Sequence, residues 1–255
     1  MKILLTNDDG IDAVGLKALE ESLRAGHEVT VCAPDREQSA SSHSLSMSRP
    51  LRLFSRGDRR FAVDGTPTDC VLLAVNGIYR GERPDVIIAG INHGQNMGDD
   101  VTYSGTVEAA IEGSILGIPS IAVSLVEVDN EYPHRTESFA SAARFLRSFL
   151  EKMAELKLPQ ATFLNINFPD LGGAAYTKYQ ITRLGLRVFS DVVSEMTDPR
   201  GQPYYWISGK PTWTHVEGSD YSAVTAGCVS ISPLRMNFDD GDTGARLGLG
   251  EAREL

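Results

Sequence analysis

Short apolar runs alternate with helical patterns through the first 175 residues or so, and this alternation constrains the fold more than any other feature. The runs at residues 2–6, 28–33, 85–89, 121–125 and 162–166 predict buried strands bounded by turn residues. Strands that alternate with helices are typical of parallel βαβ units. The pattern therefore predicts an α/β fold with a Rossmann-like, mainly parallel sheet flanked by helices.

Apolar residues at helical spacing predict the helices between these strands. Residues 52–54 and 61–63 are expected to pair as a hairpin, and Thr66 is expected to cap a helix with Pro67 and Asp69 in its first turn. Gly26 and Gly117 are expected to end two of the helices. The expected apolar faces are Leu16, Leu19 and Leu23; Val107, Ile111 and Ile115; and Phe139, Ala142, Leu146, Leu150 and Met153.

The pattern changes beyond about Tyr176, where helical periodicity disappears and short strand-like stretches such as residues 204–207 and 229–231 take over. We expect a single domain over residues 1–255, with a core at about 1–175 and a β-rich region of hairpins at about 176–255. Trp206 and Trp213 are expected to be packing residues of that region, and one alternative places them at a subunit interface. The region folds on its own subunit or reaches a partner.

Charge and composition restrict the partners of this chain. A formal net charge of −10 and the absence of a Lys/Arg cluster argue against stable binding of nucleic-acid backbones. No apolar run is long enough to span a membrane, and the polar residues Asp8 and Asp9 come too soon for a signal peptide. Cys32, Cys70 and Cys228 are scattered and lie in apolar stretches, which favours buried, reduced thiols and a cytoplasmic protein.

Three polar loops follow predicted parallel strands. The first is Asn7-Asp8-Asp9-Gly10, the second is the serine-rich loop at residues 35–48, which contains Ser39, and the third covers residues 90–103 and leads into a helix that begins at Ser104. Ligands of open α/β sheets bind outside the carboxyl ends of the strands. We therefore expect the three loops to meet at one crevice.

The adjacent carboxylates Asp8 and Asp9 indicate a cation site. Two neighbouring carboxylates repel each other unless they share a cation or a proton. Together with a serine hydroxyl and an asparagine carbonyl they would suit a hard divalent ion such as Mg²⁺ or Mn²⁺, and the absence of His and Cys from this set disfavours zinc. Taken alone, the tripeptide Asp8-Asp9-Gly10 is also typical of a turn with solvated acids.

The third loop indicates an anion site. Asn92 and Asn96 offer amide donors or a carbonyl acceptor. Ser104-Gly105-Thr106 places free backbone N–H groups at a helix start, where the helix dipole favours phosphate. The alternative is that Ser104 is only a helix cap. Three glycines allow positive φ or close approach of the backbone to a ligand: Gly90, Gly94 and Gly98.

Several of these stretches together resemble the SurE family, the stationary-phase survival proteins that act as 5′/3′-nucleotidases. The similarity covers almost the whole chain in family order. Two departures are Ala40, where a glycine is common, and Ala89, where a serine often precedes Gly90. The matching stretches are residues 3–10, 33–36 with Ser39, 65–71, 90–94, 96–98, 103–110, 165–169, 219–221, Gly227 and 232–234.

The resemblance implies roles for particular residues. It aligns Asp8, Asp9, Ser39 and Asn92 with the metal ligands of the family. It also places Asn96, Ser104, Gly105 and Thr106 where the family lines its phosphate pocket. It further implies a homodimer or homotetramer with a C-terminal hairpin region exchanged between subunits.

The expected reaction is hydrolysis of nucleoside 5′- and 3′-monophosphates by a metal-activated water, with one Mg²⁺ or Mn²⁺ ion per subunit, or Co²⁺. Asp8, Asp9 and Asn96 are the expected catalytic residues, and His43 is an expected substrate contact. One alternative makes Asp8 a covalent nucleophile, although such phosphatases typically place a second Asp two residues on, where this chain has Gly10. The other alternative is a non-catalytic sensor that binds metal and nucleotide.

Overall fold

The computed structural model describes residues 1–126, 136–153, 158–188, 192–208 and 212–237. In this part of the chain one large sheet has the strand order β3-β4-β2-β1-β5-β6-β7-β13-β8. All neighbours from β4 to β7 are parallel, whereas β3 and β13 run antiparallel to β4 and β7. The strands are β1 (Lys2–Thr6), β2 (Glu28–Pro34), β3 (Leu53–Gly57), β4 (Arg60–Val63), β5 (Val86–His93), β6 (Ser120–Val126), β7 (Thr162–Pro169), β8 (Tyr179–Ile181) and β13 (Val229–Arg235). The predicted fold class is confirmed.

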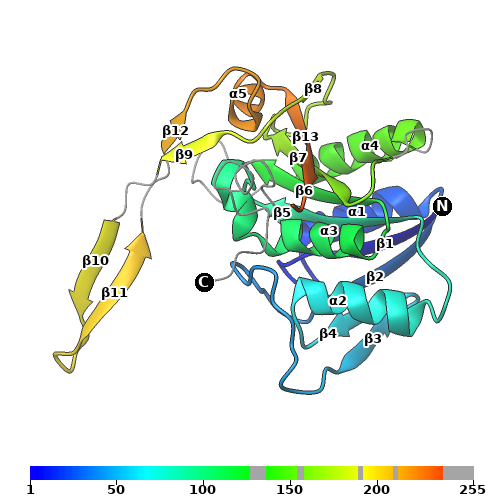
Figure 1. Ribbon diagram of the computed structural model, residues 1–255, viewed down its shortest axis with the longest axis horizontal. Helices are drawn as coiled ribbons and strands as arrows, with labels where there is room; N and C mark the ends of the chain where they lie inside the picture. Colours follow the sequence, from blue (N-terminus) through cyan, green and yellow to red (C-terminus); the bar gives the residue numbers. More distant parts are fainter. Residues whose placement is uncertain (127–135, 154–157, 189–191, 209–211, 238–255) are drawn as a thin grey trace, which may run out of the picture.

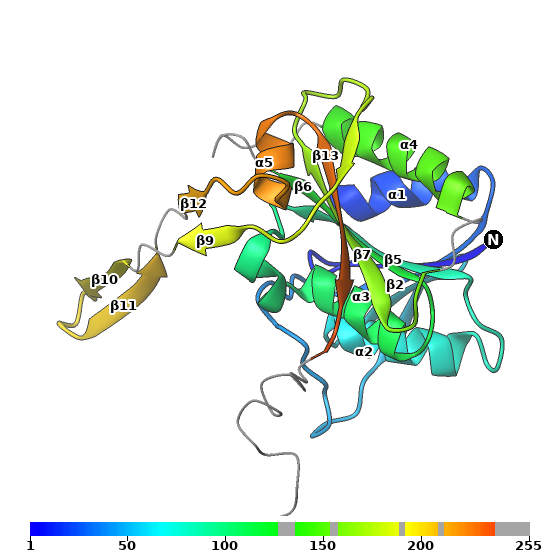
Figure 2. The ribbon, with the colours of Figure 1, turned by 45° about the horizontal axis from the view of Figure 1, so that its top comes forward.

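Helices cover both faces of the sheet, as Figures 1 and 2 show. The pair α1 (Val14–Arg24) and α4 (Thr136–Met153) lies on one face, and its buried side chains pack on the core that includes Leu16 and Phe139. The other face carries α2 (Pro67–Leu73), the π-helical turn η1 (Ala74–Ile78) and α3 (Gly105–Ile115). The parallel central strands are therefore buried on both sides, which explains their continuous apolar runs.

Local signals at the helix ends are mostly confirmed. Thr66 accepts a hydrogen bond from the backbone of Asp69, whose side chain accepts one from the backbone of Thr66, so α2 begins with a capping box. Gly117 has φ +74° just after α3. Ile115 is an exception, because it is the last residue of α3 and its side chain is 57% exposed. The side chain of Met153 lies outside the described residues.

The third loop is shorter than expected. β5 continues to His93, so residues 90–93 are strand and not loop, with a register shift between Ala89 and Asn92. Beyond the shift, Asn92 pairs with Ser124 of β6, which explains why the strand continues past the glycine. Gly98–Thr102 form the 3₁₀ turn η2 just before α3. The predicted positive φ is found at Gly90, Gly94 and Gly98.

The C-terminal region contains a projecting hairpin and parts that join the main sheet. β9 (Leu186–Val188) pairs with β12 (Thr212–Thr214), and this ribbon leads to the hairpin of β10 (Val192–Thr197) and β11 (Pro203–Ser208), which extends away from the body in Figures 1 and 2. The short helix α5 (Asp220–Thr225) was not predicted. β8 and β13 extend the main sheet. The division near residue 175 stays a prediction.

Side chains of this region differ in their environment. Trp213 stacks on Tyr221 with ring centroids 5.2 Å apart, as expected for a packing residue. Trp206 is 61% exposed, so it does not pack within this chain, and its expected place at a subunit interface stays a prediction. Cys32 and Cys70 are buried, as predicted, whereas Cys228 is only half-buried, and all three are free thiols.

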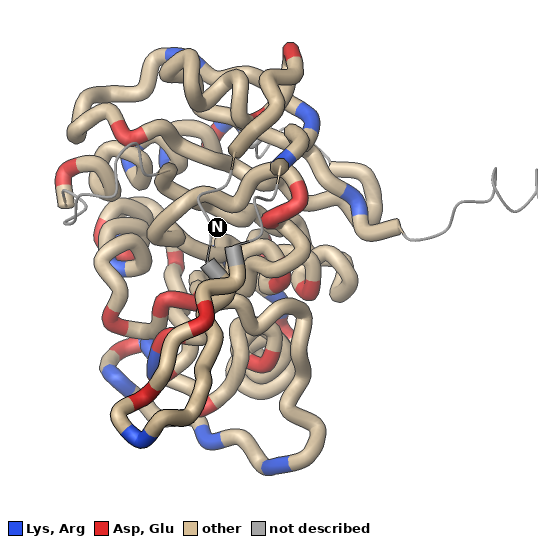
Figure 3. Tube along the Cα trace, turned by 90° about the vertical axis from the view of Figure 1, so that its left-hand side faces the viewer, with Lys and Arg blue, Asp and Glu red and all other residues tan. Residues whose placement is uncertain are grey.

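Charged side chains are spread along the chain. In the view of Figure 3, basic and acidic positions are interspersed and the basic ones do not form a continuous stripe. Within the same residues, no helix combines the length and the apolar character that crossing a membrane requires.

Candidate active site

The first loop and the start of α3 are in direct contact. Asp8 is 4% exposed and accepts a hydrogen bond from the hydroxyl of Thr106. Gly105 leaves room for this approach, because a Cβ atom there would lie 2.8 Å from the Cβ of Asp8. A side chain at position 105 would therefore force Asp8 and its neighbour Asp9, together the acid pair, away from the helix N-terminus. The sequence prediction that these two segments meet is confirmed.

Asp9 lies against the end of β5. Its Oδ2 accepts a hydrogen bond from the backbone N–H of His93 at 3.2 Å, and its Oδ1 is 3.9 Å from the His93 Nδ1. The neighbouring Asn92 uses its amide nitrogen to donate to the carbonyls of His93 and Gly94, at 3.2 and 2.9 Å. Because the side-chain nitrogen of Asn92 makes both hydrogen bonds, the side-chain oxygen is left to accept a hydrogen bond or to bind a cation.

The serine-rich loop is attached to the first loop through its backbone. The N–H of Gln38 donates to the carbonyl of Asp8 at 2.8 Å. The next residue, Ser39, is exposed and donates from its hydroxyl to Glu37 at 2.7 Å. The Ser41 hydroxyl is buried without a hydrogen-bond partner and would lie 3.1 Å from a Cβ atom at Gly105. All three predicted loops therefore adjoin Asp8 or Asp9.

The acid pair is electrostatically unsatisfied. Burial raises the pKa of Asp8, and the Thr106 hydrogen bond opposes that rise. Burial and then the charge of Asp8 raise the pKa of Asp9 to about 7. Among the described residues, no Lys or Arg forms an ion pair with either carboxylate. Two largely buried carboxylates without a Lys or Arg partner among the described residues are stabilised by a bound cation or by retained protons.

The donor set around this pair suits a hard cation. Within the described part of the chain, no group of three or more His, Cys, Asp or Glu side chains is arranged to hold a metal ion. A site here therefore needs further oxygen donors beside the two carboxylates, and the amide oxygen of Asn92, next to the His93 N–H that binds Asp9, is one of them. The Ser39 hydroxyl donates to Glu37, so its role as a metal ligand stays a prediction. Oxygen donors of this kind fit Mg²⁺ or Mn²⁺ better than zinc.

Asn96 is fixed by polar side chains from two buried strands. Its backbone N–H donates to Asn167 Oδ1 at 2.9 Å, and its carbonyl accepts from Asn165 and Asn167 at 2.8 and 3.0 Å. Its own side-chain amide donates to the Ser124 hydroxyl at 2.8 Å. All four residues are buried. Asn96 thus has a single, well-defined orientation in the loop between β5 and α3.

Sequence reasoning did not assign a role to these supporting residues. Asn165 and Asn167 lie two positions apart on β7, so their side chains point to the same face of an otherwise apolar strand. Two fully buried amides at this spacing were the available signal, because buried polar groups require hydrogen-bond partners.

The start of α3 offers backbone donors. The Ser104 hydroxyl accepts from the N–H of Val107 at 3.1 Å, so this side chain caps the helix, and its role in phosphate binding stays a prediction. The first-turn N–H groups have no partner within the helix, and α3 is long enough to have a substantial dipole at that end. Helix termini of this kind bind phosphate.

His43 connects the serine-rich loop to α3. Its Nε2 lies 2.8 Å from Glu112 and its Nδ1 lies 3.6 Å from Glu108. The hydrogen bond to Glu112 is the largest cause of a raised His43 pKa, and burial raises the pKa of Glu108. Both ring nitrogens therefore face carboxylates, and a role of His43 in substrate binding stays a prediction.

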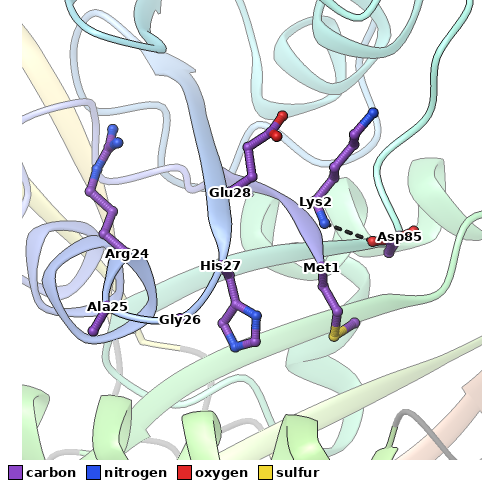
Figure 4. Close-up of a pocket in the computed structure, with 8 residues that line it drawn as sticks. All are labelled: Met1, Lys2, Arg24, Ala25, Gly26, His27, Glu28 and Asp85. Atoms are coloured by element: carbon purple, nitrogen blue, oxygen red, sulfur yellow. Dashed lines mark hydrogen bonds between the residues drawn. The ribbon is translucent and has the colours of Figure 1, made fainter.

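A surface hollow lies at the other edge of the sheet, where the parallel strands β1 and β2 begin. Figure 4 shows residues at the amino ends of β1 and β2 around it, including Met1 and His27. Its charged groups already have partners: the Asp85 carboxylate accepts a hydrogen bond from the backbone N–H of Lys2 at 2.6 Å, the Lys2 ammonium pairs with Glu82, and Arg24 pairs with Glu20 at 2.8 Å. It shares no residue with the acid pair or with the start of α3.

Fold and site together define a doubly wound α/β protein whose polar centre lies at the carboxyl edge of the sheet. The chain belongs to the SurE family, because the family model described as "Survival protein SurE" matches residues 3–191. This confirms the resemblance found in the sequence.

Relatives and a solved structure agree with this membership. A protein named 5′-nucleotidase SurE from Anaeromyxobacter sp. (strain Fw109-5) is 48% identical over 240 residues, which are 93% of this chain and 91% of the relative. One of the same name from Pelobacter propionicus is 48% identical over 93% of this chain and 94% of its own length. The crystal structure of the SurE protein from Aquifex aeolicus superimposes with a TM-score of 0.84 at 36% identity, covering 98% of this chain and 99% of that one.

Proposed function

We propose that this protein is a metal-dependent phosphomonoesterase that hydrolyses nucleoside 5′- and 3′-monophosphates to nucleoside and phosphate. Membership of the SurE family and relatives named 5′-nucleotidase support this activity. The structural observation that carries it is the contact of the buried Asp8 with Thr106. This contact brings the acid pair, the candidate cation site, beside a helix N-terminus that favours phosphate.

The proposed cofactor is one divalent ion per subunit, Mg²⁺ or Mn²⁺, with Co²⁺ as a further candidate. Asp8, Asp9, Ser39 and Asn92 would hold it. The raised pKa of Asp9 and the lack of a Lys or Arg partner among the described residues support a cation at this place. When bound, such an ion polarises a phosphoryl oxygen and lowers the pKa of water, so that the water loses a proton near neutral pH.

The chain's own groups bind and orient the phosphate in this proposal. The first-turn N–H groups of Gly105 and Thr106 and the side chains of Asn96 and Ser104 would hold the phosphoryl oxygens as negative charge shifts in the transition state. The network from β6 and β7 keeps Asn96 in place for this task. His43 is retained as a predicted substrate contact.

The acid pair also provides a proton acceptor. Burial and the neighbouring Asp8 raise the pKa of Asp9 to about 7, and a cation held by the pair would lower it again. We include Asp8 and Asp9 among the catalytic residues because, as ligands of the cation, their carboxylates would lie beside the attacking water and accept the proton that it loses.

The competing proposal is a sensor that binds metal and nucleotide without turnover. Phosphate release from a panel of nucleoside 5′- and 3′-monophosphates, each with Mg²⁺, Mn²⁺ or Co²⁺, separates the two. An enzyme releases phosphate with at least one of these ions and loses this activity with EDTA. A sensor binds nucleotide in the same solutions but releases nothing.

We also propose that the protein is a homodimer or homotetramer and that it is cytoplasmic. The hairpin of β10 and β11 exposes large apolar side chains, with Trp206 at 61% and Ile207 at 93% exposed, and such surfaces are typical of subunit interfaces. Light scattering on a chromatography column tests the assembly: an intact monomer at micromolar concentration would contradict it. The three free cysteines support a reducing compartment.

A further inference from the structure

The buried carboxylate of Asp220 joins three segments that are far apart in the sequence. Its Oδ2 accepts a hydrogen bond from the N–H of Gly98 at 2.9 Å. Its Oδ1 accepts from the N–H groups of Gly185 at 2.8 Å and Tyr221 at 2.7 Å. Asp220 is fully buried. One side chain of α5 thus holds the loop before α3 and the entry to β9.

The chain segments that Asp220 joins approach one another closely. Gly98 has φ +51°, and a Cβ atom there would lie 2.8 Å from the Gly185 carbonyl oxygen and 2.9 Å from the ring of Trp213. A Cβ atom at Gly185 would lie 2.8 Å from Asp220 Oδ1. The loop before α3 therefore packs directly on the ribbon of β9 and β12, and the carboxylate fixes its position.

A second contact connects the same two segments. Arg187 of β9 forms an ion pair with Asp100, two residues after Gly98, and both side chains are mostly buried. On its other side the loop is held by Asn165 and Asn167, which bind the backbone of Asn96. The segment from Asn96 to Asp100 is thus fixed from β7 on one side and from the C-terminal region on the other.

We propose that Asp220 is a positioning residue for phosphate binding: it sets the place of the loop that carries Asn96 and leads into the α3 N-terminus. This inference rests on the proposed function, because it takes that loop as the phosphate site. It assigns to the C-terminal region a part in shaping the active site. Asp220 itself touches neither the proposed metal ligands nor the proposed phosphate ligands.

The variant Asp220→Asn isolates the contact with the loop. An amide has one acceptor oxygen, and the Oδ1 position, with two donors, retains it. The NH₂ group then faces the N–H of Gly98, donor against donor, and that hydrogen bond is lost. Ser219→Ala is the matched control, since Ser219 is equally buried and caps α5 through Ser222 without contacting the loop.

The experiment compares these variants in the full-length, Mn²⁺-loaded protein. We measure KM for AMP, the dissociation constant of inorganic phosphate by calorimetry, and hydrogen exchange of residues 96–103. For Asp220→Asn we expect both constants to rise about tenfold and exchange in this segment to accelerate, while β5 and β6 stay protected. Ser219→Ala should lower Tm with both constants within about twofold of wild type.

Unchanged phosphate affinity in folded Asp220→Asn, or exchange that accelerates equally in the core strands, would overturn the proposal. If that variant does not fold, Arg187→Gln removes the second contact, and it should weaken phosphate binding at least threefold; wild-type affinity would contradict the proposal. If the wild-type protein binds phosphate but hydrolyses nothing, the proposed function fails. The calorimetry and the exchange at residues 96–103 still decide the role of Asp220 in that case.

Discussion

The carboxylate of Asp9 accepts a hydrogen bond from the backbone N–H of His93 at 3.2 Å, across 84 positions of sequence. This bond joins the end of β1 to the end of β5, the next strand in the sheet. It places the acid pair beside Asn92 and, through the Asp8–Thr106 contact, beside the start of α3. The proposed cation and phosphate sites are neighbours for this reason.

Asp9→Asn should stabilise the metal-free protein at pH 8. The pKa of Asp9 is raised to about 7, so the folded protein keeps a proton that the unfolded chain has already released above about pH 4. The raised pKa therefore lowers the free energy of unfolding increasingly between about pH 4 and pH 7. Above pH 7 the loss is complete, on the order of 2–4 kcal/mol. The variant avoids this loss but should also lack the rise of Tm on addition of Mn²⁺. Thermal melts with EDTA and with Mn²⁺ test both effects; a metal-free variant less stable than wild type at pH 8 would contradict them.

Thr106→Val should lower kcat/KM about 10- to 100-fold and should also lower Tm. The substitution keeps the shape of a fully buried side chain but removes the hydrogen bond to Asp8, and bonds to charged groups contribute about 1.5–3 kcal/mol. Thr68→Val is the matched control, because Thr68 is also fully buried and its hydroxyl has no hydrogen-bond partner. Steady-state kinetics that show equal losses in both variants would argue against a specific role of Thr106.

Asn167→Ala should reduce activity more than Asn165→Ala. Asn167 both accepts from the N–H of Asn96 and donates to its carbonyl, whereas Asn165 makes only the second kind of contact. We expect Asn167→Ala to lower stability by about 1–3 kcal/mol, because it leaves buried groups unpaired. Urea unfolding and kcat/KM, measured on the same preparations, check the order of the two variants. The reverse order would show that Asn96 is held by other contacts.

The stabilising effect of His43 should be greatest in mild acid. The hydrogen bond to Glu112 raises the pKa of His43. The stabilisation that protonated His43 gives the folded protein is therefore complete below about pH 6.5 and is lost as pH rises through the folded-state pKa. We expect the Tm difference between wild type and His43→Gln to be larger at pH 6 than at pH 9. A difference that grows with pH would mean that the neighbouring buried Glu108 dominates the titration.

The sequence predicted those features that depend on local chemistry. Thr66, Pro67 and Asp69 define the start of α2 on their own, and the apolar runs predict the parallel strands. The order of loops at strand ends was sufficient to expect Asp8 and Thr106 at one edge of the sheet, because the carboxyl ends of parallel strands lie together.

Features that depend on distant contacts were not predictable in the same way. α5 has only six residues, which are too few for a periodic signal. Its cap, Ser219, can be recognised as a helix start only once the segments that pack around α5 are known. The ion pair of Asp100 with Arg187 depends on how β9 packs, so the residues around Asp100 in the sequence do not reveal it. The role of Asn165 and Asn167 became clear only once Asn96 was located beside them.

The central claim is that one divalent cation, held by Asp8, Asp9, Ser39 and Asn92, is required for phosphate release. Its most direct test titrates chelated protein with Mn²⁺ and measures free Mn²⁺ by electron paramagnetic resonance beside the rate of phosphate release from AMP. We predict one bound ion per chain, a rate proportional to occupancy, and neither binding nor turnover in the double variant Asp8→Asn, Asp9→Asn. Full turnover in the chelated protein, or unchanged Mn²⁺ binding in the double variant, would contradict the claim.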